Sequence, residues 1–201
     1  LKTHNAFGGL KNCPFTDKTN TLGAIYLVRD PRDVLVSYSR HLEMSIEETL
    51  ELVLEDDHKG WLNEDKKDVI GEIRGSWAQN YNSWKNFYLS EKIIIRYEDL
   101  IDDTFNTFSK IIIFLSKLFS KHSSFLEVDN KKIEKCIELS DFNKLKNLEK
   151  EKGFVENFKK EKPFFYKGKT KQWQNILDEK TVYKLEKKFK KEMIELGYLY
   201  K

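Results

Sequence analysis

The sequence predicts an α/β fold in which helices flank a parallel central sheet. Two short apolar runs, residues 24–28 and 92–96, are rich in β-branched side chains, which is typical of buried strands. Each run passes directly into a helical pattern, and further helical patterns separate the two runs. Consecutive strand–helix units of this kind form parallel sheets with right-handed crossovers.

The first strand is expected to end where a helix starts. Asp30 is a favoured helix N-cap, Pro31 suits the first helical position, and a carboxylate at Asp33 favours the positive end of the helix. Arg29 therefore falls at the carboxyl end of a strand, which is the edge where open α/β sheets bind ligands. The alternative is that Arg29 pairs with Asp30 or Asp33 and only braces the turn.

The remaining helices follow from apolar periodicity and from start signals. They are expected over residues 46–54, from residue 77, over residues 102–120 and 130–139, from residue 140, and over residues 178–196. Ser45 can cap the first of these, and Asp99 or Asp102 can cap the helix over residues 102–120. The aromatic stripe formed by Trp77, Tyr81 and Trp84 is expected to be core.

Length and composition predict a single domain over residues 1–201, with enough apolar content (39%) for a substantial core. The net charge is only +3, but from residue 144 onward there are 17 Lys and Arg against 9 Asp and Glu. A basic stretch of this kind serves an anionic ligand, a nucleic acid or only a solvated surface.

Cys13 and Cys136 stand apart without a CxxC pattern, so neither a metal site nor a disulfide framework is indicated. A reducing, cytoplasmic location is expected on this ground. No apolar run approaches the roughly 18 residues of a membrane span, so no membrane span is expected.

The sequence around Arg29 resembles a known nucleotide-binding segment. Val-Arg-Asp-Pro-Arg-Asp-Val at residues 28–34, followed by Ser-Tyr at residues 37–38, is similar to the 3′-phosphate-binding segment of sulfotransferases that use 3′-phosphoadenosine 5′-phosphosulfate (PAPS). The resemblance implies that Arg29 and Ser37 hold the 3′-phosphate. It also implies the architecture of P-loop nucleoside-triphosphate hydrolases. A guanidinium and a hydroxyl are suitable donors to phosphate oxygens.

The first residues of the chain resemble a second element of that family. Lys2-Thr3-His4 matches a Lys-Thr-His strand end, and His4 precedes Arg29 by 25 residues, as in the family layout. The resemblance implies that His4 is the general base that takes the acceptor proton, and that Lys2 stabilises charge on the transferring group. An unperturbed imidazole has a pKa of about 6.5 and suits this role. Lys2 and His4 would share one face of a strand. The alternative is a frayed terminus.

Three further family elements follow in order along the chain. The resemblance implies that Tyr97, in Tyr-Glu-Asp-Leu, contacts the adenine region, and that Ser140 and Phe142 flank the adenine. A strand-to-helix joint, a helix cap and a core phenylalanine are the alternatives for these residues. The segment over residues 166–175 resembles the one that closes over the 3′-phosphate, with Lys167 and Gly168 as its ligands.

That closing segment also departs from the family pattern. Tyr166 stands where the family has arginine, Lys171 where it has its second glycine, and Gln172 where it has aspartate. Lys169 and Lys171 are positioned to replace the lost positive charge.

The resemblance implies in-line transfer of a sulfuryl group from PAPS, as co-substrate, to the hydroxyl of a small-molecule acceptor, an alcohol or phenol, with no metal. The family's Pro-Lys-Ser-Gly-Thr-Thr-Trp-like loop lies upstream of Lys-Thr-His, and the printed sequence contains no such turn. We therefore expect these residues to be the C-terminal portion of a longer enzyme, and the isolated chain to turn over negligibly.

Three other functions remain open at this point. A nucleotide kinase of related topology would need a phosphate loop and Mg²⁺, and a nucleic-acid-binding module would use the basic C-terminal third. A non-catalytic member of the same fold is the third. No nucleic-acid partner is expected, and a homodimer is left open.

Overall fold

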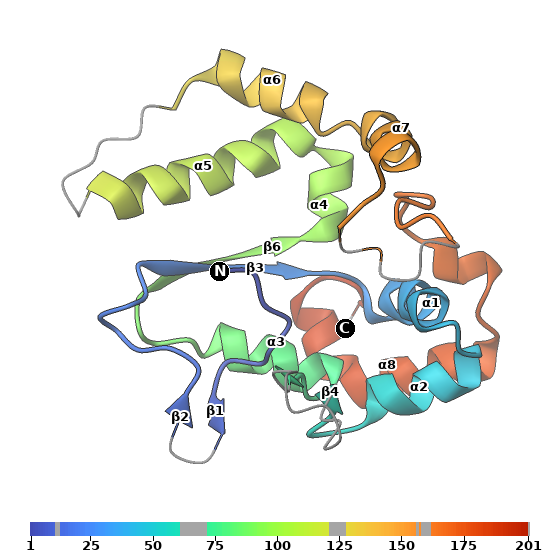
Figure 1. Cartoon of the computed structure of the whole chain (residues 1–201). Helices are drawn as coiled ribbons and strands as arrows, with labels where there is room; N and C mark the ends of the chain where they lie inside the picture. Colours follow the sequence, from blue (N-terminus) through green and yellow to red (C-terminus); the bar gives the residue numbers. More distant parts are fainter. Residues whose placement is uncertain (11–12, 61–71, 121–127, 156, 158–161, 201) are drawn as a thin grey trace. The chain divides into compact units, whose positions relative to one another are not determined.

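The computed structural model describes residues 1–10, 13–60, 72–120, 128–155, 157 and 162–200 (Figure 1). The chain forms two compact units. Unit 1 comprises residues 1–96 and 172–201, and unit 2 comprises residues 97–171. Each unit is described by itself.

A pair of parallel strands lies in unit 1. β3 (Gly23–Val28) and β6 (Glu91–Arg96) pair in register, from Gly23 opposite Glu91 to Val28 opposite Arg96. The prediction of two parallel strands at these positions is confirmed. Because parallel strands end on the same side of a sheet, the residues after Val28 and after Arg96 leave from one edge.

The helix after β3 begins as the sequence predicts. α1 (Pro31–Leu42) has Asp30 as its N-cap, and the Asp30 carboxylate accepts a hydrogen bond from the Arg32 backbone N–H at 2.9 Å. α2 (Ile46–Leu54) and α3 (Trp77–Lys85) each begin with a capping box, Ser45 with Glu48 and Ser76 with Gln79. These caps satisfy the backbone donors that every helix leaves unpaired at its start.

The core of unit 1 lies between α1, α2 and α8 (Glu179–Glu195), whose ribbons run close together in Figure 1. It consists of Leu35, Leu50, Val53, Leu185, Phe189 and Met193, and most of these are fully buried. The apolar stripe of α8 comes from more than 130 residues further along the chain than Leu35, so this core depends on long-range packing.

The first residues of unit 1 differ from expectation. Residues 1–4 form no strand, and the strands nearby are two-residue antiparallel pairs: β1 (Gly9–Leu10) with β2 (Cys13–Pro14), and β4 (Lys59–Gly60) with β5 (Glu72–Ile73). The Ala6 N–H donates to the Ile73 carbonyl at 2.7 Å, so the chain meets β5 only after His4. In the described part of the chain, no strand pairs with Lys2 or His4.

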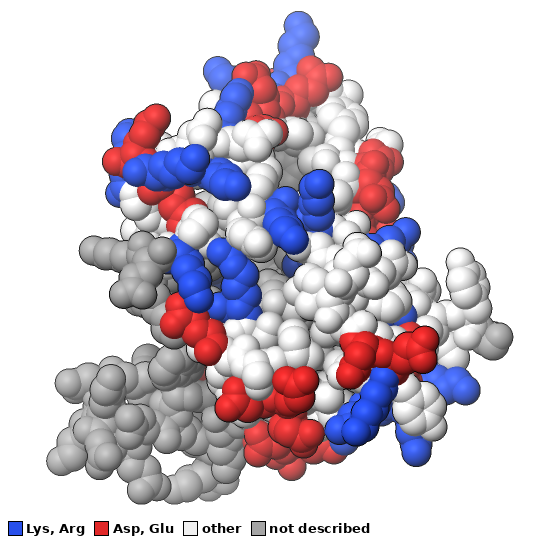
Figure 2. Space-filling model, turned by 90° about the vertical axis from the view of Figure 1, so that its right-hand side faces the viewer, with Lys and Arg blue, Asp and Glu red and all other residues white. Residues whose placement is uncertain are grey.

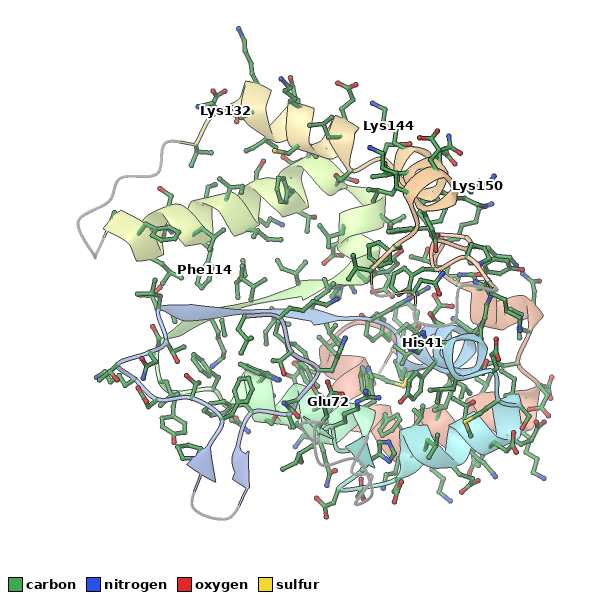
Figure 3. The ribbon with its side chains drawn as sticks, viewed as in Figure 1. His41, Glu72, Phe114, Lys132, Lys144 and Lys150 are labelled. Carbon is green, nitrogen blue, oxygen red and sulfur yellow. The ribbon has the colours of Figure 1, made fainter. Side chains whose placement is uncertain are left out.

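Unit 2 is helical in its described residues. It contains α4 (Tyr97–Asp102), α5 (Thr104–Ser120), α6 (Asn130–Leu139) and α7 (Phe142–Lys152). α6 lies along α5 in Figure 1, and Lys144 of α7, labelled in Figure 3, pairs with Glu138 of α6 at 2.7 Å.

The caps expected before α5 are wrong in detail. Asp99 and Asp102 lie inside α4, because a helix begins directly at Tyr97. The break falls at Asp103 instead, whose carboxylate accepts the N–H of Asn106 at 3.3 Å.

We predict that Leu35→Ala lowers the free energy of unfolding by about 2–5 kcal/mol, because Leu35 is fully buried and its removal leaves a cavity. Chemical denaturation measures this loss. The matched change Leu139→Ala, at a helical leucine that is 62% exposed, should alter stability by less than about 0.5 kcal/mol. Equal losses for the two variants would contradict the assignment of this core.

Candidate functional site

Arg29 follows β3 directly and precedes α1, at the edge where parallel sheets bind ligands. Its Nη2 lies 3.3 Å from Oδ2 of Asp33, and its carbonyl accepts a hydrogen bond from Trp77 Nε1 at 3.0 Å. The Arg29 side chain keeps 20% exposure, whereas that of Asp33 is 1% exposed. The bracing pair considered from the sequence is therefore present, and the partly exposed guanidinium is still accessible from solvent.

Arg32 is the buried centre of a second ion-pair network. Its Nη2 lies 2.6 Å from Asp30 Oδ2, and its Nη1 lies 2.6 Å from Oε1 of Glu186 on α8. Burial alone would lower the pKa of Arg32, but the hydrogen bonds and charges of Asp30 and Glu186 outweigh it and raise the pKa above its ordinary value. Arg32 therefore holds the start of α1 against α8.

The same turn binds a distant segment, the single helical turn η1 (Gln172–Asn175). Oδ1 of Asp33 accepts the backbone N–H of Trp173 at 3.1 Å, and the guanidinium carbon of Arg32 lies 4.0 Å from the centre of the Trp173 ring. Trp173 is therefore held through its main chain and through its ring by two consecutive residues of α1.

Lys171, immediately before η1, has φ +57°, in the left-handed region that favours glycine. The position at which the resemblance expects a glycine thus keeps a glycine-like backbone while carrying a lysine.

Ser37 is exposed two turns into α1, on the helix that Arg29 precedes. Arg29 lies in the turn between β3 and α1, and Ser37 follows eight residues later on α1. Both residues belong to unit 1.

The backbones of His4 and Arg29 are held by neighbouring side chains of α3. Asn80 Nδ2 donates to the His4 carbonyl at 3.1 Å, one helical turn after Trp77, which binds the Arg29 carbonyl. Asn80 is itself oriented by the Tyr26 hydroxyl at 3.0 Å. Burial, and then the neighbouring Tyr81, raises the pKa of Tyr26 above its ordinary value, so this hydroxyl stays a neutral donor. The side chains of Lys2 and His4 are exposed.

In unit 2, Phe142 and Gly168 lie in contact. Phe142 opens α7, and Gly168 has φ +59°, with its backbone so close that a Cβ there would lie 2.6 Å from the Phe142 ring. The Phe142 ring also packs edge-to-face on Phe165, with centroids 6.2 Å apart. Two residues that the sequence assigned separately to the nucleotide are thus neighbours.

The other predicted residues of unit 2 lie at element ends. Tyr97 begins α4 and is half-buried, and Ser140 is the exposed C-cap of α6, with its hydroxyl donating to the Cys136 carbonyl at 2.8 Å. Lys167 is exposed, with its Nζ 5.3 Å from the centre of the Tyr166 ring.

Sequence reasoning missed two buried carboxylates that organise these segments. The sequence suggested that Asp33 favours the helix end or pairs with Arg29, but it did not suggest that Asp33 also binds Trp173. Glu149 of α7 accepts the backbone N–H groups of Phe164 and Phe165 at 2.6 and 2.9 Å, and so fixes the loop before Lys167. Long-range contacts of this type leave no local signal in a single sequence.

A shallow hollow of about 600 Å³ lies elsewhere in unit 1. It is lined by Phe7, Gly8, Gly9, Pro14, Thr16, Ser83, Asn86 and Tyr88. These residues surround the C-terminal half of α3, whereas Trp77, which binds Arg29, begins that helix. The hollow is therefore not assigned to the sheet edge at Arg29.

Within the described ranges, no cluster of three or more His, Cys, Asp or Glu side chains has metal-binding geometry. No helix in that part of the chain combines the length and hydropathy needed to cross a membrane. Lys and Arg side chains are interspersed with Asp and Glu over the face shown in Figure 2, which does not favour one continuous nucleic-acid surface there.

Comparison with known proteins identifies the class. The sulfotransferase domain family matches residues 1–197, so the chain belongs to that family. The family predicted from the sequence is therefore confirmed.

Curated relatives come from animals and plants. A 3-alpha-hydroxysteroid sulfotransferase of Cavia porcellus is 30% identical over 161 residues, which are 75% of this chain and 49% of the relative. Cytosolic sulfotransferase 15 of Arabidopsis thaliana is 30% identical over 91% of this chain and 49% of its own length. A flavonol 3-sulfotransferase of Flaveria bidentis is 25% identical over 88% of this chain and 56% of its own length. The chain thus spans about half the length of these curated relatives.

Solved structures share the fold. A mouse sulfotransferase complexed with PAP superposes with a TM-score of 0.64 and 24% identity, covering 92% of this chain and 63% of the mouse chain. A retinol dehydratase in a complex with retinol and PAP gives a TM-score of 0.56 at 20% identity, covering 84% of this chain and 47% of that one. The predicted sulfotransferase-type α/β fold is confirmed.

We predict that Gly168→Ala destabilises unit 2 by about 2 kcal/mol, because alanine disfavours a positive φ and its Cβ would collide with the Phe142 ring. Thermal unfolding measures the loss. Gly8→Ala is the matched control, since nothing lies within 4 Å of the added Cβ and no positive φ is involved. The loss should shrink in a Phe142→Ala background. If it does not, the Gly168–Phe142 contact is not its cause.

Proposed function

We propose that this chain is the nucleotide-binding and proton-accepting part of a sulfotransferase that transfers a sulfuryl group from PAPS to a hydroxyl on a small molecule. Membership of the sulfotransferase domain family supports the reaction class. The single observation that carries the proposal is a partly exposed Arg29 guanidinium between the end of β3 and the N-terminus of α1, the strand–helix joint that favours an anion.

Arg29 and Ser37 would bind the 3′-phosphate of the donor. The residues fit that group: the guanidinium is a planar fork of donors, Ser37 is exposed on the helix that follows Arg29, and the N-terminus of this helix adds a positive dipole end. In unit 2, Lys167 would contribute a positive charge to phosphate binding. Gly168, which has no side chain, would allow backbone N–H groups to approach the phosphate. Tyr97, Ser140 and Phe142 would contact the adenine. Residues 1–201 are proposed to belong to a single sulfotransferase domain.

His4 would accept the proton of the acceptor hydroxyl, and Lys2 would stabilise negative charge on the transferring group. The bound donor supplies the sulfuryl group and a phosphate leaving group. No metal is part of the proposal, because positioning and charge stabilisation can supply the catalysis of such a transfer. The contact of Asn80 with the His4 carbonyl supports the role of His4, since it fixes the backbone of the base one helical turn from the residue that fixes Arg29.

The names of the relatives support a class of acceptor. Their names specify hydroxysteroids and a flavonol, all of which carry hydroxyl groups on fused-ring skeletons. An alcohol or phenol on a small apolar molecule is therefore proposed as the acceptor. The name of the Arabidopsis relative supports a cytoplasmic setting.

Calorimetric titration tests the donor site with two nucleotides. One is 3′-phosphoadenosine 5′-phosphate (PAP), and the other is adenosine 5′-phosphate, which lacks the 3′-phosphate. Arg29→Ala should weaken PAP binding at least 10-fold, because a hydrogen bond to a charged group contributes about 1.5–3 kcal/mol, and should leave adenosine 5′-phosphate binding nearly unchanged. Lys85→Ala removes one positive charge from unit 1 at the far end of α3, where it pairs with Glu195, and serves as the control. Equal PAP affinity in wild type and Arg29→Ala would reject the assignment.

Replacement of His4 tests the chemistry in whichever length of the protein carries out sulfation. His4→Ala should lower kcat about 100-fold or more and leave PAP affinity within twofold, because a general base contributes to the transfer rather than to donor binding. His41→Ala is the control, because it removes a histidine that has no proposed role and lies on the last turn of α1 (Figure 3). Full activity of His4→Ala would favour a different base or a non-catalytic member of the fold.

A further inference from the structure

The buried carboxylate of Asp33 joins two segments that lie 140 residues apart in the chain. Its two oxygens have separate partners. Oδ2 faces the Nη2 of Arg29 at 3.3 Å, and Oδ1 accepts the Trp173 backbone N–H at 3.1 Å. One side chain therefore touches both the arginine at the end of β3 and the main chain of η1.

Burial of the Asp33 carboxylate costs free energy of hydration unless its two partners compensate for the loss. The residue is 1% exposed, and a buried carboxylate loses several kcal/mol of hydration that only charged or hydrogen-bonding partners restore. Its place in the first turn of α1 adds the favourable helix dipole. Any rotation of the Asp33 side chain would separate it from both partners at once.

The adjacent residue strengthens the same connection. Arg32 stacks on the Trp173 ring at 4.0 Å and is itself fixed by Asp30 and Glu186. Since Arg32 holds the ring and Asp33 holds the N–H, η1 is attached to the start of α1 at two points. Lys171, with its left-handed backbone, is the residue that leads into this attachment.

We propose that Asp33 is a positioning residue for the phosphate site: it orients the Arg29 guanidinium and fixes η1 beside it before the nucleotide binds. This inference rests on the proposed function and goes beyond it, because it assigns to Asp33 a share of the recognition of the 3′-phosphate that Asp33 does not itself contact. A negative charge beside a phosphate ligand would by itself weaken binding, so the proposal states that orientation outweighs this repulsion.

The test compares the affinities of PAP and of adenosine 5′-phosphate, whose ratio isolates the contribution of the 3′-phosphate. Asp33→Asn keeps the size of the side chain and an oxygen for the Trp173 N–H, but it removes the charge that holds Arg29. The expected result is a roughly 10-fold fall in this ratio, with adenosine 5′-phosphate affinity unchanged within twofold.

Two comparisons make the result specific to Arg29. Glu192→Gln is the matched control, because Glu192 is another buried carboxylate of unit 1 and accepts from Asn82 on α3. It should leave the ratio unchanged. In an Arg29→Ala background, Asp33→Asn should have no further effect on the ratio, because the guanidinium that the Asp33 charge orients is absent and the substituted side chain keeps an oxygen for the Trp173 N–H.

Three outcomes overturn the proposal. Tighter PAP binding by Asp33→Asn would mean that Asp33 competes with the phosphate for Arg29. Equal losses of affinity for PAP and for adenosine 5′-phosphate would indicate a purely structural role. A change in the affinity ratio that is undiminished in the Arg29→Ala background would indicate the same. If Asp33→Asn does not fold, Asp33→Glu, which retains the charge but displaces it by one methylene, must lower the ratio.

Failure of the proposed function has a different signature. A wild-type chain that binds PAP no better than adenosine 5′-phosphate has no 3′-phosphate site, whatever Asp33 does. A wild-type chain that distinguishes the two nucleotides, together with an Asp33→Asn variant that distinguishes them equally well, rejects only the positioning role.

Discussion

Three charged side chains, Asp30, Arg32 and Asp33, are buried within four residues at the start of α1, and unit 1 is arranged to satisfy them. Each charge withdrawn from water costs several kcal/mol unless partners compensate for the loss. The partners come from α8, from the carbonyl of Tyr198 near the C-terminus and from η1, in addition to Arg29. Segments more than 100 residues apart must therefore meet at one strand–helix joint. The same joint places an arginine at the ligand-binding edge of the sheet.

Local rules were sufficient for most helices and strands. The N-cap at Asp30, the capping box at Ser45 and the parallel pairing of β3 with β6 all lie where short-range patterns predict them. These features depend on a few neighbouring residues, or on apolar runs long enough to be unambiguous. The helix expected over residues 102–120 is present as α5, but its expected caps at Asp99 and Asp102 are wrong, because Tyr97 begins a separate helix without any of the usual capping residues.

The organisation of the site was only partly predictable. Sequence motifs identified Arg29 and Gly168 as candidate site residues. They did not indicate that Asp33 contacts Trp173, or that Glu149 contacts the loop before Lys167. Such contacts are set by tertiary packing. In the sequence, a buried aspartate in the first turn of a helix cannot be distinguished from an exposed one. The expected strand at Lys2 and His4 illustrates the same limit, since a strand exists only where a partner offers hydrogen bonds, and here a side chain of α3 takes that place.

The left-handed backbone of Lys171 has a consequence for how relatives of this chain are recognised. A sequence pattern that requires glycine before this tryptophan would not match Lys171, although the φ of Lys171 lies in the region that favours glycine. Lys171 adopts this left-handed backbone at a conformational cost of about 1–2 kcal/mol, which a glycine would not incur. A signature written in torsion angles would therefore gather more distant members than one written in amino acids.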